Sequence, residues 1–321
     1  MQHAEIGLIL SLAAVMQSAP PQQPASSPEN YVIRADVNMI VVHATVQDRR
    51  GGFVSGLSKD AFTITEDGVK QQIVGFSSDD VPVAVGLVID NSASMGGRWS
   101  EVITGALTFI RDSKPEDQIF VVHFSDTARL GLPEDHPFSA DPAELRTALL
   151  KGTVGGHTAL YDGVAQALDQ FEKASLIKKV LLIVSDGGDN KSHNRLNDIV
   201  KRADRAGVLI YTIGLFDEHS EDKNPNVLKQ LARQTGGLAY LPKDVTRVPE
   251  ICSQIARDIR NQYTISYNSS KASADSGYHQ IKVTALDADN NQLRVRSRTG
   301  FFGVPSPTTK ETEPQPRPSP Q

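Results

Sequence analysis

The chain has 321 residues, of which 39% are apolar and 22% charged, and this composition is typical of a globular protein with more than one domain or with one extended domain. Its formal net charge of −5 comes without a basic cluster, which argues against nucleic acid as the main partner. The single cysteine, Cys252, excludes an internal disulfide framework and a cysteine-rich zinc site.

The first thirty residues predict an exported chain. Residues 6–16 form an apolar run of signal-peptide length that is too short to span a bilayer, and Ser18 and Ala19 supply small residues near a possible cleavage point. We therefore predict a signal peptide over 1–19 and a disordered leader, rich in Pro, Ser and Gln, over 20–30. The expected location is extracytoplasmic (secreted, periplasmic or in the cell envelope), with no membrane span in the mature chain.

The segment 31–80 has the pattern of β-strands. Apolar residues alternate with their neighbours from Ile40 to Val46 and again from Phe62 to Thr65, which is the period of a half-buried strand. Asp67-Gly68 is a strong signal for a hairpin turn. We predict that this segment forms the first half of a small β-sandwich.

The segment 81–261 alternates apolar strands with amphipathic helices. Strands that are apolar on both faces, separated by such helices, indicate a mostly parallel sheet covered on both sides, so the predicted fold class is α/β with a doubly wound sheet. The strands are expected at 81–89, 119–124, 180–184 and 208–213, and the helical spacing occurs at 99–110, 160–171 and 196–203.

Residues 262–303 return to a β pattern, and the Pro-rich tail 304–321 is predicted to be disordered. Because isolated hairpins are marginal in water, we expect 262–303 to complete the sandwich begun by the first β segment, with the α/β domain inserted between the two halves. Arg294, Arg296 and Arg298 alternate late in this segment. A solvated strand face is the expected explanation, and a basic stripe for acidic ligands is the alternative.

Short oxygen-bearing side chains follow the ends of two predicted strands. Asp90 comes at the end of the strand predicted at 81–89, and Ser92 and Ser94 lie in the turn after it. Asp186 follows the strand predicted at 180–184. Thr158, in "GGHTALYDG", is expected to open a helix. Doubly wound sheets bind ligands at the carboxyl ends of their strands, and oxygen ligands without histidine or thiolate suit Mg²⁺ or Mn²⁺. We therefore predict a metal site made of these residues.

A simpler explanation exists for each motif alone. Ser and Asp are preferred helix N-caps, so "DNSAS" and "HTAL" would satisfy free backbone N–H groups, and Gly187-Gly188 would form an ordinary turn. The occurrence of all three motifs in this order around one sheet favours the metal site.

At these residues the sequence resembles the von Willebrand factor type A domain, whose metal-ion-dependent adhesion site has the pattern D-x-S-x-S, then a distant T and a distant D. The resemblance implies that Ser92, Ser94 and Thr158 contact the ion through hydroxyls, and that Asp90 and Asp186 act directly or through waters. It covers the α/β segment. The flanking β segments resemble, more loosely, those of bacterial proteins that carry a related domain.

Three further residues are predicted to lie beside the ion or to contact a partner: His157, Asn91 and Gly187. His157 departs from the family pattern, because relatives often have glycine before the threonine. His157 would narrow the opening of the metal site or donate a hydrogen bond to a bound acid. The alternative is an exposed histidine without a role.

The resemblance implies a non-enzymatic adhesion or interaction module, in which the ion coordinates a Glu or Asp of a protein partner. One alternative is an envelope scaffold protein, in which the sandwich makes the contacts and the metal mainly stabilises the fold. Another is a Mg²⁺-dependent hydrolase with Asp90 as nucleophile. Such enzymes often carry a second acid two residues further on, where this chain has Ser92.

Overall fold

The structure, a computed structural model, describes residues 38–216, 222–272 and 275–304. The predicted signal peptide and leader, and the tail beyond Val304, lie outside the described residues. None of the helices within the described ranges combines the length and the apolar character that crossing a bilayer requires.

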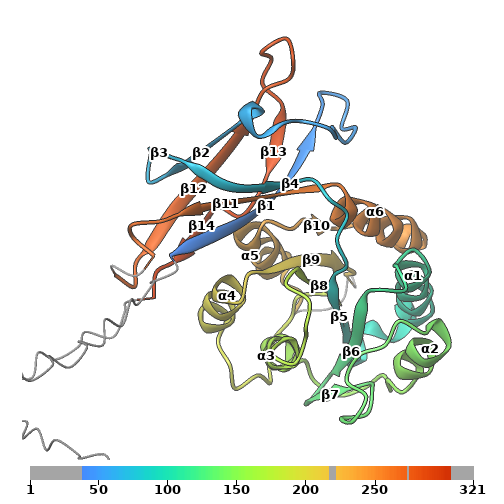
Figure 1. The fold of residues 1–321 in the computed structure, drawn as a ribbon. Helices are drawn as coiled ribbons and strands as arrows, with labels where there is room; N and C mark the ends of the chain where they lie inside the picture. Colours follow the sequence, from blue (N-terminus) through green and yellow to red (C-terminus); the bar gives the residue numbers. More distant parts are fainter. Residues whose placement is uncertain (1–37, 217–221, 273–274, 305–321) are drawn as a thin grey trace, which may run out of the picture. The chain divides into compact units, whose positions relative to one another are not determined.

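A six-stranded sheet in the order β10-β9-β8-β5-β6-β7 forms the centre of the α/β part (Figure 1). The strands from β10 to β6 are parallel to one another, and the edge strand β7 is antiparallel to β6. β5 and β9 are buried along their whole length and β8 is buried after its first residue, as a sheet covered on both faces requires. The bounds are β5 (Ala84–Asp90), β6 (Gln118–Phe124), β7 (Ala128–Leu130), β8 (Lys179–Ser185), β9 (Val208–Gly214) and β10 (Ala239–Tyr240).

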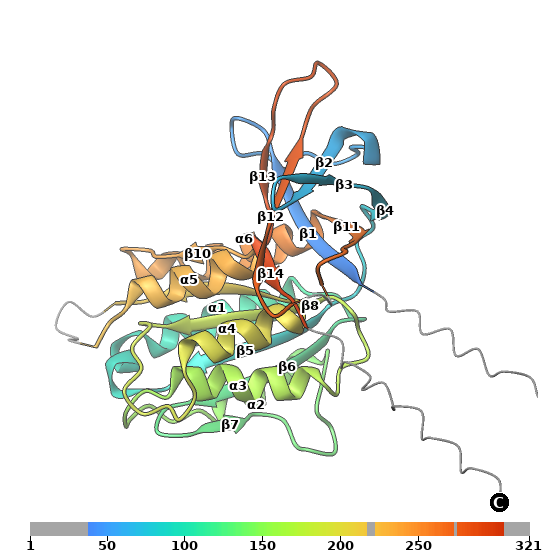
Figure 2. The same ribbon diagram turned by 90° about the vertical axis from the view of Figure 1, so that its left-hand side faces the viewer.

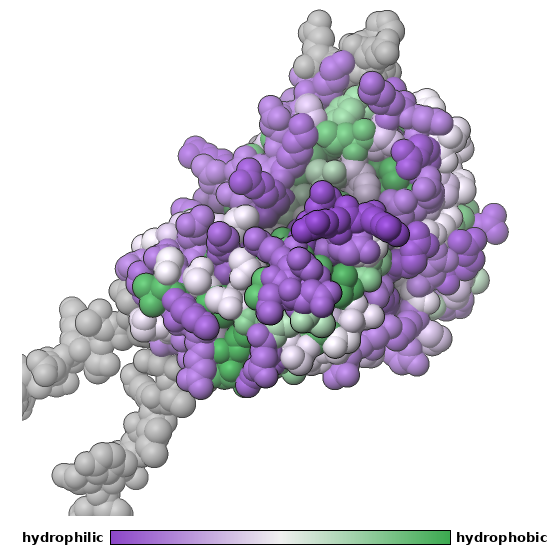
Figure 3. Space-filling model, turned by 90° about the horizontal axis from the view of Figure 1, so that it is seen from above, coloured by the Kyte–Doolittle hydropathy of each residue, from purple (hydrophilic) through white to green (hydrophobic). Residues whose placement is uncertain are grey.

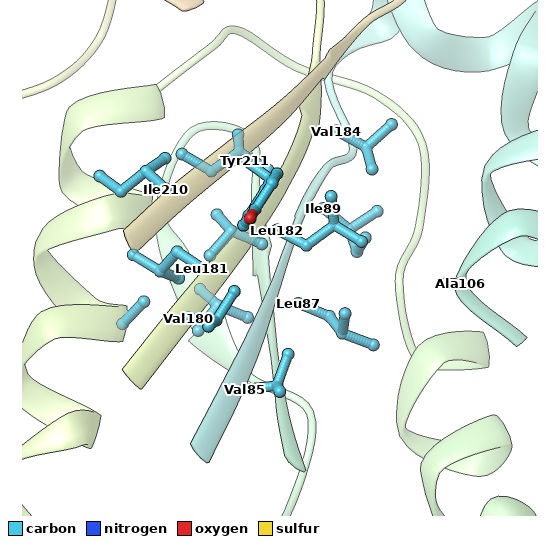
Figure 4. Packing of buried hydrophobic residues seen from close by; sticks show 14 of the residues in the cluster. Val85, Leu87, Ile89, Ala106, Val180, Leu181, Leu182, Val184, Ile210 and Tyr211 are labelled. Atoms are coloured by element: carbon cyan, nitrogen blue, oxygen red, sulfur yellow. The ribbon is translucent and has the colours of Figure 1, made fainter. Parts of the chain in front are cut away.

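Helices cover both faces of this sheet. In Figure 1, α1, α2 and α6 lie on one side and α3, α4 and α5 on the other. Figure 4 shows how the aliphatic side chains of β5, β8 and β9 pack together beside α1, which contributes Ala106. The bounds are α1 (Trp99–Arg111), α2 (Pro142–Leu150), α3 (Leu160–Phe171), α4 (Leu196–Arg205), α5 (Pro225–Thr235) and α6 (Val248–Arg260).

The remaining strands form two four-stranded antiparallel sheets, in the orders β13-β1-β11-β4 and β14-β12-β2-β3. Each sheet joins strands from before the α/β part to strands from after it. This confirms the predicted architecture, in which a doubly wound domain is inserted into a small β-sandwich. The bounds are β1 (Met39–Gln47), β2 (Phe62–Glu66), β3 (Val69–Gln71), β4 (Ile73–Ser77), β11 (Gln262–Asn268), β12 (Tyr278–Ala285), β13 (Arg294–Arg296) and β14 (Gly300–Phe302).

The two sheets of the sandwich share one apolar core. Phe62 of β2 lies against Tyr263 of β11 and Phe76 of β4, with ring centroids 4.9 and 5.4 Å apart. Asp67 and Gly68 both have positive φ, at 47° and 83°, as the predicted hairpin turn requires. Figure 3 looks onto this end of the molecule from above, where hydrophilic side chains dominate and apolar ones form separate patches.

Arg296 and Arg298 do not lie on a solvated strand face, so that prediction was wrong. The Arg296 guanidinium pairs with Asp258 of α6, and the Arg298 guanidinium pairs with Asp204 of α4. Both carboxylates are buried, and a buried charge is retained only when it is paired. The alternation along the strand shows which residues share a side, but it does not show which helix packs there.

His43 of β1 is expected to make the stability of the fold sensitive to acid. Burial lowers the pKa of this half-buried histidine to about 3, and the charges of Lys178 and Arg298 lower it further. The unfolded chain takes up the proton near pH 6.5 and the folded chain does not, so stability is complete above pH 6.5 and falls as the pH decreases toward 3. Between pH 7 and pH 5, the free energy of unfolding of the wild type should fall by about 1–2 kcal/mol more than that of His43→Gln.

Urea denaturation at both pH values measures this difference. The matched control is His136→Gln, because the His136 side chain is 60% exposed. This control should retain the pH dependence of the wild type. Equal pH dependence in His43→Gln and the wild type would show that His43 is not responsible.

Candidate metal centre

The two predicted acidic ligands lie at neighbouring strand ends. Asp90 is the last residue of β5, and Asp186 directly follows β8. These strands are adjacent and parallel, with Ile89 paired to Val184, so their carboxyl ends reach the same edge of the sheet. The order of strands along the chain reverses around β5, which is where doubly wound sheets form ligand sites.

Asp90 is a fully buried carboxylate whose oxygens both accept hydrogen bonds. Oδ1 accepts the Ser92 N–H at 2.8 Å, and Oδ2 accepts the Ser185 hydroxyl at 2.6 Å. Burial raises the pKa of Asp90 to about 6, the hydroxyls of Ser185 and Ser92 oppose this rise, and the charge of Asp186 adds to it. Within the described part of the chain, no Lys, Arg or His forms an ion pair with Asp90.

The hydroxyls predicted as ligands do not act as helix caps. Ser92 precedes the short 3₁₀ helix at 93–98, but its side chain makes no capping hydrogen bond, and its Oγ lies 3.1 Å from Ser94 Oγ. Thr158 does not open α3 as predicted, because the N-cap of α3 is Ala159. The capping explanation therefore does not account for Ser92 or Thr158.

Backbone hydrogen bonds hold the Thr158 loop against the turns after three strands. The Ala159 N–H donates to Ser125 O, just after β6, at 2.8 Å. The Ala93 N–H donates to Gly156 O at 3.2 Å, which connects the loop to the Ser92 turn. Thr158 itself is buried and its N–H donates to Asn190 Oδ1 at 3.0 Å, which connects it to the loop after Asp186. The three motifs are therefore parts of one hydrogen-bonded edge.

The donor chemistry of this edge fits a hard divalent cation. Two carboxylates and three hydroxyls are the ligands that Mg²⁺ or Mn²⁺ prefers, and such ions keep several waters. No cluster of three or more His, Cys, Asp or Glu side chains suited to a metal occurs in the described ranges, which leaves a mixed carboxylate and hydroxyl set as the candidate. An ion here would also offset the cost of burying the Asp90 charge beside Asp186.

The sequence did not identify two supporting residues. The Ser185 hydroxyl donates to Asp90 and accepts the Gly187 N–H at 3.0 Å. The Asn190 amide bridges Thr158 and Asp222, with its Nδ2 2.7 Å from Asp222 Oδ2. Both belong to the motif "VSDGGDN", so their position beside Asp186 was the available signal.

The other three predicted residues occupy distinct places. Gly187 has a φ of +79°, and a Cβ there would lie 2.3 Å from the backbone oxygen of Asn224, so only glycine fits. Asn91 is buried, with its Oδ1 3.0 Å from His123 Nδ1. His157 is exposed, and its Nδ1 lies 2.8 Å from Asp126 Oδ1.

Comparison with known proteins places this chain among similar sequences and folds. The family model of the von Willebrand factor type A domain matches residues 84–254. The inter-alpha-trypsin inhibitor heavy chain H3 of Rattus norvegicus is 29% identical over an alignment of 173 residues that covers 50% of this chain. The chain spans 19% of the length of that curated relative.

Two solved structures have a similar fold. A von Willebrand factor type A protein from Catenulispora acidiphila is 14% identical with a TM-score of 0.50, over 83% of this chain and 73% of that one. Proximal thread matrix protein 1 from the mussel byssus is 18% identical with a TM-score of 0.50, over 61% of this chain and 51% of that one.

Proposed function

The chain belongs to the von Willebrand factor type A domain family, and on this premise we propose that it is a non-enzymatic, divalent-cation-dependent protein-binding module. In this proposal Mg²⁺ or Mn²⁺ is held by Asp90, Ser92, Ser94, Thr158 and Asp186. The ion supplies an open coordination position for a Glu or Asp carboxylate of the partner.

The buried Asp90 carboxylate is the observation that carries this proposal. It lies next to a second carboxylate, its pKa is raised, and no cationic side chain among the described residues compensates its charge. A bound cation would satisfy that requirement and would use the Ser92 and Thr158 hydroxyls, which cap no helix.

The chain's own residues would keep the ligands in place. Ser185 and the Ser92 N–H orient the two oxygens of Asp90, and the Gly188 N–H holds Asp186 Oδ1 at 2.9 Å. Asn190 fixes the backbone at Thr158. Ligands held in advance in this way lose little entropy when the ion and the partner carboxylate bind.

The same geometry makes Asp90 a poor candidate for a hydrolytic nucleophile. A nucleophile must reach its substrate, whereas Asp90 is fully buried and both its oxygens accept hydrogen bonds. The position two residues further on is Ser92, which cannot supply a general acid of the carboxyl type. The ligand role is therefore favoured over the catalytic one.

We place this module outside the cytoplasm, on the predicted signal peptide at 1–19. We also propose the domain limits 81–261 for the metal-binding domain and 31–80 with 262–303 for the sandwich.

Affinity capture from an envelope extract tests the proposed function. The wild type should retain a partner in Mg²⁺ and release it in EDTA, because the ion is the bridge. Ser92→Ala should reduce the capture at least about tenfold, since it removes one ligand beside Asp90. The control is Ser113→Ala, which removes a hydroxyl that bonds only the backbone oxygen of Phe109 in the described residues.

Three results would contradict the proposal or redirect it. Capture of the same protein in EDTA and by Ser92→Ala would exclude the metal bridge. A rise in melting temperature with Mg²⁺, without any Mg²⁺-dependent partner, would favour the scaffold alternative. Turnover of a phosphate or ester substrate that is lost in Asp90→Ala would favour the enzyme.

A further inference from the structure

Asn91 lies between the first two proposed ligands, in the turn after β5, and its main chain is held on both sides. The Asn91 N–H donates to the backbone oxygen of Phe124, the last residue of β6, at 2.7 Å. The Asn91 C=O accepts the N–H of Gly155 at 2.7 Å, and Gly155 belongs to the loop that leads to Thr158. The position of Asn91 therefore affects both the turn after β5 and the loop that carries the Thr158 hydroxyl.

The Asn91 side chain is buried in contact with His123, which lies near the end of β6. His123 Nδ1 is 3.0 Å from Asn91 Oδ1, and His123 Nε2 is 2.9 Å from the backbone oxygen of Ala148 in α2. Figure 2 shows β6 next to β5 and close to α2, so His123 connects the turn after β5 to that helix. A Cβ at Gly152 would lie 2.5 Å from Asn91 Nδ2 and 2.7 Å from His123 Nδ1, so no larger residue fits beside the pair.

The contact with Ala148 determines where His123 carries its proton. A carbonyl oxygen only accepts hydrogen bonds, so Nε2 must be the protonated nitrogen. Burial lowers the pKa of His123, the bond to Ala148 opposes this shift, and the charge of Lys151 adds to it. His123 is therefore neutral at pH 7, and its unprotonated Nδ1 can only accept a hydrogen bond.

The Asn91 amide supplies the donor that His123 Nδ1 requires. An amide oxygen cannot donate, so with Oδ1 facing Nδ1 two acceptors would oppose each other. Asn91 Nδ2 is buried and has no hydrogen-bond partner among the described residues, which is rare for a buried donor. Rotation of the amide by half a turn exchanges Oδ1 and Nδ2. This single change gives Nδ1 its donor and Nδ2 its acceptor.

We propose that Asn91 and His123 are positioning residues of the metal centre, with the Asn91 amide donating to His123 Nδ1 and the His123 Nε2–H donating to Ala148. This inference rests on the proposed function, because the ion is what the turn would hold. The pair fixes the main chain between Asp90 and Ser92 before the ion arrives. Ligands that are arranged in advance bind at a lower cost in entropy.

Mn²⁺ titration of two His123 variants tests the role of the pair, with free Mn²⁺ measured by its spin resonance. In His123→Gln the amide nitrogen takes the place of Nε2 and keeps the bond to Ala148, but no acceptor faces Asn91. In His123→Asn the amide oxygen takes the place of Nδ1 and keeps the acceptor for Asn91, whereas the bond to Ala148 is lost. Mn²⁺ affinity should fall about tenfold in His123→Gln and stay within about threefold of the wild type in His123→Asn.

Replacement of Asn91 tests the other half of the pair. Asn91→Ala should also lower the Mn²⁺ affinity about tenfold, and Asn91→Ala/His123→Gln should lose no more than either single variant. The matched control is Asn261→Ala, because Asn261 is exposed and its side chain donates to the backbone oxygen of Arg257. This control should stay within about twofold of the wild type.

The ¹⁵N spectrum of the His123 ring in the metal-free protein gives a readout that does not depend on the ion. We expect a proton on Nε2 and none on Nδ1 at pH 7, and Asn91→Ala should shift the Nδ1 resonance because it removes the donor. A doubly protonated ring, or a proton on Nδ1 alone, would overturn the inference.

The metal titrations separate this inference from the proposed function. Wild-type Mn²⁺ uptake with unchanged affinity in Asn91→Ala would overturn the inference and leave the metal site in place. So would affinities that follow the urea midpoints of the variants, because a purely structural role for His123 predicts that relation. A wild type that takes up no Mn²⁺ would overturn the proposed function together with the inference.

Discussion

Replacement of Asp90 with alanine is expected to abolish the uptake of Mg²⁺ and Mn²⁺. Asp90 is the buried carboxylate at the end of β5, and Ser92 and Ser185 orient its oxygens. Loss of a hydrogen-bond partner of a metal ligand weakens binding by about 10–100-fold, so loss of the charged ligand itself should cost more than about 100-fold. Isothermal titration calorimetry, or the spin resonance of free Mn²⁺, measures the affinity directly.

Thermal stability gives a second readout of the same change. Mg²⁺ at about 100 times its dissociation constant should stabilise the wild type by about 2.7 kcal/mol, and Asp90→Ala should show no such effect. Without metal, Asp90→Asn should instead be more stable than the wild type at pH 7 by about 1–2 kcal/mol, because it removes a buried charge. The control is Asp135→Ala, an exposed carboxylate that should leave metal affinity within about twofold of the wild type.

This prediction distinguishes a metal centre from a polar turn. A wild type that takes up neither ion would refute the site, and so would Asp90→Ala with unchanged affinity. If Asp90→Asn were less stable than the wild type in EDTA, the carboxylate would be required for the hydrogen bonds of the turn itself.

Much of the fold could be predicted because its patterns are local. Strands with apolar residues on both faces and helices apolar on one face identify the doubly wound sheet. Asp67-Gly68 identifies the hairpin between β2 and β3 in the sandwich. The pairing of the two β segments followed from a physical argument, since neither could bury a core alone. The pairing of β1 with β11 confirms that argument.

The candidate site was predictable only in part. Asp90 and Asp186 follow adjacent parallel strands, so their approach follows from topology. The position of Thr158 near these two strand ends depends on hydrogen bonds from its loop to Ser125 and Asn190, which no spacing along the chain reveals. Thr158 was included because it was expected to open a helix, whereas the N-cap of α3 is Ala159.

The ion pairs of Arg296 and Arg298 could not be predicted, because their acidic partners are distant in the sequence. Arg296 and Asp258 are 38 residues apart, and Arg298 and Asp204 are 94 apart. A strand pattern records the side on which a residue lies and leaves its partner unspecified. Only the packing of α4 and α6 against the sandwich determines that these arginines are paired.

Replacement of Arg296 with methionine is expected to destabilise the whole described fold. Asp258 is buried, and among the described residues its donors apart from Arg296 are neutral, namely the hydroxyls of Thr45 at 2.8 Å and Tyr211 at 2.9 Å. Burial raises the pKa of Tyr211 well above its ordinary value, so this residue remains a neutral donor. Removing the guanidinium leaves the buried Asp258 charge without its ion-pair partner, which costs about 3–5 kcal/mol. Urea denaturation measures the change, and the control Arg294→Met should stay within about 0.5 kcal/mol of the wild type.

A double variant decides whether the cost lies in the ion pair or in the side-chain volume. Arg296→Met combined with Asp258→Leu removes both charges, so it should recover most of the lost stability. Arg296 and Asp258 connect β13 to α6, and Thr45 and Tyr211 extend this contact to β1 and β9. The single variant Arg296→Met should therefore also separate unfolding into two transitions, one for the sandwich and one for the α/β part. A single transition with wild-type stability in Arg296→Met would show that this pair does not join the two parts.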